Sequence, residues 1–248
     1  MTARTSMSCL ALAALAWSCT PAASGSSGSA PRPAATPAST TSAARNTGAW
    51  TPLFDGTSFT GWRGYKVDTV PSGWRVVDGT IAKTRPVEDI VTVKEYGDFE
   101  LEIEWKIGRA GNSGIFYRGT EEYDHIYWTA PEYQLLDDEK APDGKDRITS
   151  AGADYALYPS PAGHLKPVGQ WNQTRIVAKG PHVEHWLNGK MIASYNVGDA
   201  EWAAAIDASK FKPARYPNFG KATTGFLGIQ GDHPGTLALR NIRIRELK

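Results

Sequence analysis

Residues 99–107 read Phe-Glu-Leu-Glu-Ile-Glu-Trp-Lys-Ile, so that every second side chain is apolar. Successive side chains of a β-strand point to opposite faces, and this run therefore predicts a strand with one buried face and one face toward water. Such a pattern is typical of an outer antiparallel sheet that packs on a second layer.

The chain after Trp50 continues as short strands, which turn residues separate at intervals of roughly ten residues. Asp78-Gly79 and Asn188-Gly189 are signals for tight two-residue hairpins. Residues 201–206 predict one or two helical turns. The sequence thus predicts a single all-β domain over residues 50–248, a two-sheet antiparallel sandwich. Its further predicted strands are 114–118, 133–136, 173–179, 183–187, 191–197, 225–230 and 237–247.

The N-terminal part of the chain predicts export. In residues 1–19, Arg4 precedes an apolar stretch that is too short to span a bilayer, as in a signal peptide. Ala16-Trp17-Ser18-Cys19 resembles a bacterial lipobox with Cys19 as the lipid-modified residue; an ordinary cleaved signal is the alternative. Residues 20–49 are almost wholly small or Pro residues and predict a disordered tether. We therefore expect a lipoprotein of the periplasm or cell envelope.

Charge and composition limit the classes of partner that the chain is expected to bind. The chain has 27 Lys plus Arg against 26 Asp plus Glu, which favours neither nucleic acid nor an anionic membrane surface, so any membrane contact would come through a lipid on Cys19. Its 9 Trp and 10 Tyr suit carbohydrate, because aromatic rings stack on the apolar faces of sugars. Both cysteines, Cys9 and Cys19, lie in the signal segment, which leaves the domain without a disulfide or a cysteine nucleophile.

The run Pro131-Glu-Tyr-Gln-Leu-Leu-Asp-Asp138 carries the best candidate for a site. Read as a strand, it places Glu132 and Gln134 on one face. A carboxylate beside a carboxamide offers hydrogen bonds to a polyhydroxylated ligand such as a sugar. A solvated strand face is the alternative, and the surrounding Trp, Tyr, Asn and His residues favour the site.

An ordered set of motifs extends over nearly the whole domain. The set comprises Leu53-Phe-Asp-Gly-Thr57, Gly111-Asn-Ser-Gly-Ile-Phe-Tyr-Arg118, Glu132-Tyr-Gln-Leu-Leu-Asp137, Tyr155-Ala-Leu-Tyr-Pro159, Val183-Glu-His-Trp-Leu-Asn-Gly189 and Gly228-Ile-Gln-Gly-Asp-His233. Together these motifs resemble the 3-keto-disaccharide hydrolase family. The resemblance implies a jelly-roll sandwich similar to concanavalin-like and LamG-like lectins and glucanases. One position departs from the family pattern, because Gly231 stands between Gln230 and Asp232.

The resemblance also implies a reaction, the cleavage of 3-keto-glycosides or 3-keto-disaccharides. A ketone at C3 makes the C2 proton acidic, so that a base can remove it, the C1 substituent can leave and water can add. Candidate catalytic residues are Glu132, His185 and Asp137. Candidate substrate-binding residues are Gln134, Asn112, Ser113, Arg118, Tyr158, Trp171, Gln230 and His233.

Two other functions and one cofactor stay open at this level. A lectin-like sandwich can bind carbohydrate without catalysis, and paired carboxylates can cleave unoxidised glycosides. Asp137 together with Glu132 could ligate a divalent cation such as calcium, although no metal-loop spacing accompanies them.

Overall fold

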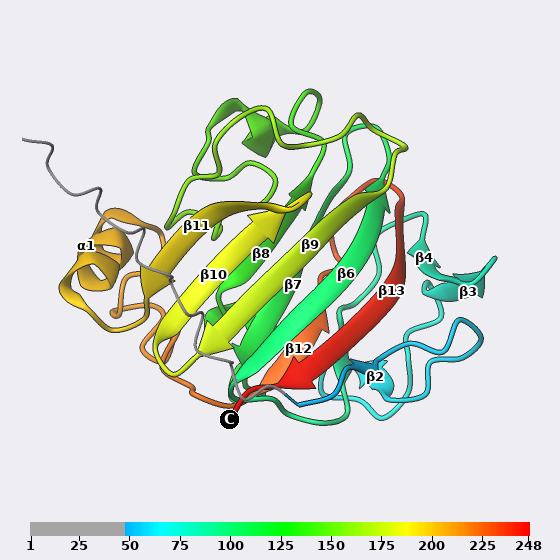
Figure 1. Ribbon diagram of the computed structural model, residues 1–248, viewed down its shortest axis with the longest axis horizontal. Coiled ribbons are helices and arrows are strands. Elements are labelled where there is room, and N and C mark those ends of the chain that lie inside the picture. The colour runs from blue at the N-terminus through cyan, green and yellow to red at the C-terminus, as the bar shows by residue number, and fades with distance from the viewer. Residues whose placement is uncertain (1–47) are drawn as a thin grey trace, which may run out of the picture. The chain divides into compact units, whose positions relative to one another are not determined.

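The structure, a computed structural model, describes residues 48–248 as a sandwich of two antiparallel sheets (Figure 1). This confirms the predicted all-β class. The larger sheet has the order β11-β10-β9-β6-β13-β4-β3, with β1 also pairing with β13. The smaller sheet has the order β2-β5-β12-β7-β8. The predicted signal of residues 1–19 and almost all of the predicted tether lie outside the described residues.

The strands of the larger sheet are β1 (Thr51–Pro52), β3 (Arg75–Val77), β4 (Thr80–Lys83), β6 (Phe99–Ile107), β9 (Asn172–Lys179), β10 (His182–Leu187), β11 (Lys190–Asn196) and β13 (Leu237–Glu246). Those of the smaller sheet are β2 (Trp62–Gly64), β5 (Ile90–Thr92), β7 (Asn112–Gly119), β8 (Glu132–Leu136) and β12 (Phe226–Ile229). One helix, α1 (Ala200–Ala208), and two 3-10 turns, Ile126–Trp128 and Pro142–Lys145, complete the described elements.

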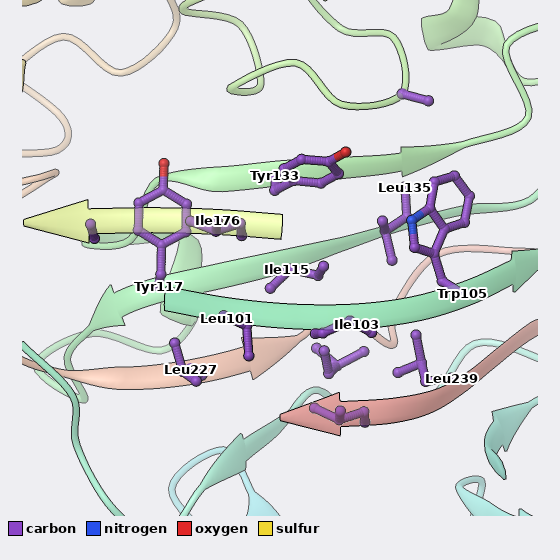
Figure 2. Packing of buried hydrophobic residues seen from close by; sticks show 14 of the residues in the cluster. Leu101, Ile103, Trp105, Ile115, Tyr117, Tyr133, Leu135, Ile176, Leu227 and Leu239 are labelled. Carbon is purple, nitrogen blue, oxygen red and sulfur yellow. The ribbon is translucent and has the colours of Figure 1, made fainter. Parts of the chain in front are cut away.

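The core lies between the two sheets. Strand β6 turns Leu101, Ile103 and Trp105 inward, as its alternation predicts, and all are at most 1% exposed. Strands β7 and β8 face them with Ile115, Tyr117, Tyr133 and Leu135, as Figure 2 shows. The outward side of β6 carries glutamates that pair with arginines of the neighbouring strands. Burial on one face therefore fixes the register of each strand, since a slip of one residue would expose this apolar set.

The connections follow their turn chemistry. Two hairpins have two-residue turns: Asp78-Gly79 joins β3 to β4, and Asn188-Gly189 joins β10 to β11. All four turn residues have positive φ, the geometry of a type I′ turn. The predicted helical turns at 201–206 are part of α1, which Asp199 caps by accepting a hydrogen bond from the Trp202 amide at 2.8 Å. The short strands β1, β2 and β5 have too few residues for a clear alternation and were not predicted. No helix among residues 48–248 is long and apolar enough to cross a membrane.

Candidate active site

A polar cavity of about 260 Å³ lies against the face of the smaller sheet that points away from the core. Its floor comes from the sheet, and its walls come from the loops that follow the strands. The lining side chains are Asn112, Tyr127, Glu132, Gln134, Asp143, Tyr155, Lys210, Phe211, Tyr216, Gln230, Asp232 and His233. Asn112, Glu132, Gln134, Gln230 and His233 were predicted from the sequence, and the structure brings all five together.

The alternation of β8 explains the floor. Tyr133 and Leu135 point into the core and are fully buried, so Glu132 and Gln134 must point to the other face. Strand β7 pairs with β8 and places Asn112 beside them, while Gln230 directly follows β12 on the far side of β7. The sheet thus holds one carboxyl and three carboxamide groups on a rigid surface.

The amide oxygens on this floor are unsatisfied. Asn112 Oδ1, Gln134 Oε1 and Gln230 Oε1 are buried and have no hydrogen-bond partner within residues 48–248. Buried polar atoms normally have partners, so such a group at a cavity points to a ligand or to ordered water. Carbonyl oxygens accept hydrogen bonds, and sugar hydroxyls are suitable donors.

Glu132 is the most perturbed group in the cavity. It is only 7% exposed, and burial raises the pKa of its carboxyl to about 8, with further contributions from the negative charges of Asp89, Asp232 and Asp154. The ammonium of Lys210 opposes this shift. Perturbed carboxyls in clefts are frequent among catalytic groups, because a pKa near neutrality suits proton transfer.

Gly114 makes room for the Glu132 side chain. A Cβ at position 114 would lie 2.7 Å from both Cγ and Cδ of Glu132, closer than real Cβ atoms approach other atoms. The position must therefore be glycine if the carboxyl is to lie flat over β7. The Gly-Asn-Ser-Gly segment around it is thus more than a turn, because its second glycine shapes the cavity floor.

One wall of the cavity consists of residues that the sequence patterns do not predict. Lys210 reaches over it with its Nζ 4.3 Å from the centre of the Tyr155 ring. The Tyr155 hydroxyl donates to Asp143 Oδ2 at 3.4 Å, and Asn112 Nδ2 donates to the same oxygen at 3.3 Å. These residues lie on loops, and no spacing within the sequence links them. The signals that the sequence does carry are the Tyr155–Pro159 motif and the basic, proline-containing stretch 210–221.

The segment that contains the additional residue Gly231 forms part of the cavity. Gln230 before Gly231 and Asp232 and His233 after it all line the cavity. Gly231 donates its amide to Asp89 Oδ1 at 2.7 Å, and a Cβ there would approach the Glu88 carbonyl oxygen to 2.8 Å. Buried Lys83 donates to the His233 carbonyl at 2.7 Å, so the side chains of Lys83 and Asp89 both hold this loop.

His185 does not lie in this cavity, which corrects the expectation of a catalytic histidine. It is fully buried on β10 between the two sheets, with its ring centre 4.8 Å from that of Tyr133, on the core side of β8. Its ring nitrogens lie 3.1 Å from the Gly152 carbonyl and 3.1 Å from the Tyr117 hydroxyl. Burial lowers its pKa to about 4, so it is a neutral core residue.

Asp137 is also turned away, and its proposed metal pairing with Glu132 was wrong. Its carboxylate accepts hydrogen bonds from the amides of Ala110 at 2.7 Å and Glu139 at 3.1 Å, on the opposite side of the strand. No group of three or more His, Cys, Asp or Glu side chains within residues 48–248 is arranged to hold a metal ion. The donor set present in the described domain therefore does not fit the calcium site considered above.

Four predicted binding residues lie elsewhere. Ser113 points into the core and donates to the Gln230 carbonyl at 2.7 Å, so it holds the floor without lining it. Arg118 donates to the carbonyls of Gly97 and Gly180 and pairs with Asp98. Tyr158 stacks on Tyr195 with centroids 4.4 Å apart, and Trp171 lies under Arg240 at 4.0 Å on the larger sheet. None of the four contributes to the polar cavity.

Fold and cavity together define a jelly-roll-type sandwich with a small polar pocket that suits a hydroxyl-rich ligand. Residues 49–245 match the family described as the 3-keto-alpha-glucoside-1,2-lyase-like domain, and the chain belongs to this family. It is 35% identical over 225 residues to a 3-keto-disaccharide hydrolase of Bacteroides thetaiotaomicron, over 79% of this chain and 77% of the relative.

Solved structures agree with this assignment. One Parabacteroides distasonis protein, described as a candidate glycosyl hydrolase, superimposes with a TM-score of 0.74 at 36% identity, over 80% of this chain and 94% of that one. A second such protein from the same organism gives 0.67 at 29% identity, over 80% and 100% of the two chains. A Bacillus subtilis protein with a galectin-like fold gives 0.52 at 10% identity, over 82% and 97%, and supports the fold alone.

Proposed function

We propose that the protein cleaves glycosides that carry a ketone at C3 of the sugar. The curated relative is named for the hydrolysis of 3-keto-disaccharides, and the family is described by a lyase activity on 3-keto-alpha-glucosides. The observation that carries the proposal is Glu132, a buried carboxyl at the cavity with a raised pKa. It lies among amide oxygens that lack partners.

The proposed reaction is an elimination followed by hydration. A base removes the proton from C2, and the electron pair of that C–H bond forms an enolate with the C3 ketone. Collapse of the enolate expels the oxygen substituent from C1 and leaves a double bond between C1 and C2. Water then adds its oxygen to C1 and a proton to C2, so that the net change is hydrolysis.

Glu132 is the proposed base. A carboxylate with a pKa of about 8 is a stronger base than an ordinary one and is still partly ionised near neutral pH. The proton taken from C2 neutralises it, which removes a buried charge and makes the transfer more favourable. The same acid can return the proton to C2 during hydration.

Lys210 is the proposed stabiliser of the enolate. Its ammonium reaches over the cavity next to Tyr155, and a cation close to a developing oxyanion lowers the energy of the transition state. His233 on the same wall is the proposed acid for the leaving oxygen. The amide groups of Asn112, Gln134 and Gln230 would orient the hydroxyls of the sugar.

The test compares a methyl glucoside with its chemically oxidised 3-keto form. We expect cleavage of the keto form alone in the wild-type protein, no turnover in Glu132→Gln, and wild-type rates in Glu95→Gln, an exposed glutamate outside the cavity. Cleavage of the unoxidised glucoside would instead identify a conventional glycosidase that uses Glu132 with Asp143 or Asp232. Binding without cleavage would identify a carbohydrate-binding module.

We also propose that the protein is exported and anchored through Cys19, on the strength of the signal-like residues 1–19 alone. Cells that express the full chain would be fed an alkyne analogue of palmitate, and the protein would be examined for label. We expect labelling of the wild type and of Cys9→Ala, and none of Cys19→Ala. A secreted, unlabelled wild-type protein would identify an ordinary cleaved signal.

A further inference from the structure

A second and larger cavity lies beside the polar one. It has a volume of about 760 Å³ and is enclosed by α1, the end of β11 and the segment 211–223. Its walls are mainly apolar and aromatic, and include Trp202, Ile206, Phe211, Tyr216, Pro217 and Phe219. Arg118 is its buried polar group, and the guanidinium donates to Gly97, Gly180 and Asp98 rather than into the open space.

The two cavities share a wall. Phe211 and Tyr216 line both of them, and each side chain is almost fully buried. The Phe211 ring stacks on Phe219 at 4.1 Å and meets the Tyr216 ring edge-on at 5.3 Å. These two rings therefore stand between the polar cavity and an apolar, aromatic-lined space.

The volumes and linings of the two cavities suit different parts of a substrate. The polar cavity is slightly smaller than the roughly 300–1,000 Å³ of sites for drug-sized ligands, so it suits one sugar ring and not two. The adjoining space offers few hydrogen-bonding groups. A second sugar buried there would lose hydration of its hydroxyls without replacement, whereas an apolar group would gain from burial.

We propose that this apolar cavity is the aglycone subsite, and that it takes an aromatic or aliphatic group attached through oxygen to C1 of the 3-keto sugar. This inference rests on the function proposed above, because it places the sugar in the polar cavity. The preferred substrates are then glycosides of hydrophobic alcohols, in preference to disaccharides. Phe211 and Tyr216 lie at the glycosidic bond and contact both halves of the substrate.

Three 3-keto-glucosides with alkoxide leaving groups test the subsite: methyl, 2-phenylethyl and glucosyl. The methyl and 2-phenylethyl leaving groups have comparable intrinsic reactivity. We expect kcat/KM for the 2-phenylethyl compound to exceed that for the methyl compound by about tenfold or more, through a lower KM. A higher kcat/KM for the glucosyl compound than for the 2-phenylethyl compound would overturn the inference.

Two alanines of α1 provide matched variants. Ala203 lines the apolar cavity, whereas Ala204 does not, and both are solvent-exposed positions of the same helix. Ala203→Phe places a phenyl ring at the cavity wall and should reduce the preference for 2-phenylethyl over methyl. Ala204→Phe should preserve the preference. Equal preferences in the two variants would refute the subsite.

Binding of 2-phenylethanol, measured by calorimetry, gives a readout that does not depend on turnover. We expect binding to the wild type and to Ala204→Phe, and at least tenfold weaker binding to Ala203→Phe. If no keto substrate is cleaved but this pattern holds, the proposed reaction fails and the apolar site stands. If methyl 3-keto-glucoside is cleaved but the alcohol binds equally to both variants, the reaction stands and the subsite fails.

Discussion

Replacement of Glu132 by Gln should change the pH dependence of stability in a defined way. The carboxyl has an ordinary pKa of 4.5 when exposed and about 8 in the folded protein. Between these pH values the folded state holds a proton that the unfolded state has lost. The contribution of Glu132 to stability is therefore fully present below pH 4.5 and is lost as the pH rises to 8.

The size of the effect follows from the shift. Each pKa unit corresponds to about 1.4 kcal/mol, so the shift of Glu132 costs up to about 5 kcal/mol of unfolding free energy above pH 8. Glutamine has nearly the same shape and does not ionise. The Glu132→Gln variant should match the wild type near pH 4.5 and gain about 1.4 kcal/mol relative to it per pH unit up to pH 8.

Urea unfolding of both proteins at pH 5, 6, 7, 8 and 9 would measure this difference. Asp89 and Asp154 also have raised pKa values, but they are present in both proteins and so largely cancel in the comparison. Glu95→Gln, at an exposed glutamate outside the cavity, serves as the matched control. A flat difference for Glu132→Gln would refute the burial of an uncharged carboxyl at this site.

The remaining predictions concern neighbouring groups. Gly114→Ala should displace the Glu132 side chain and reduce kcat at least tenfold, measured with the methyl 3-keto-glucoside; retained activity would contradict the tight contact. Lys210→Met should raise the pKa of Glu132 further, because the ammonium favours the carboxylate, and the pH–rate profile should move to higher pH; an acid shift would exclude this pairing. His185→Phe should leave the Gly152 carbonyl unpaired and cost about 1–3 kcal/mol in unfolding free energy while the folded enzyme keeps its kcat; a selective loss of kcat would restore the catalytic role. Asp137→Ala should cost about 1–3 kcal/mol through its two backbone hydrogen bonds, and its loss in Tm should be equal in calcium and in chelator; a calcium-dependent loss would argue for a metal ligand.

The position of the catalytic candidates has a structural logic. The sheet supplies the groups that must be rigid, Glu132 and the three amides, while loops supply Lys210 and Tyr155. Strand-borne groups keep their spacing because neighbouring strands are hydrogen-bonded, and loop-borne groups adapt the fold to a particular ligand.

The sequence by itself determined the parts of the protein that depend on near neighbours. Alternation placed Glu132 and Gln134 on one face of β8, and Leu101, Ile103 and Trp105 on one face of β6, because the side-chain period of a strand is a local property. Likewise, Asn188-Gly189 sufficed for its hairpin, since positive φ at two successive residues is available to few other pairs.

Only the tertiary structure decided whether a polar side chain on a strand points into the core or into the cavity, and which loops close over the site. His185 and Glu132 are both polar residues on predicted strands, yet one points between the sheets and the other away from them. Lys210 and Tyr155 meet although 55 residues of sequence separate them. The raised pKa of Glu132 arises from burial by residues distant in sequence, so it cannot be predicted from the neighbours of Glu132 along the chain.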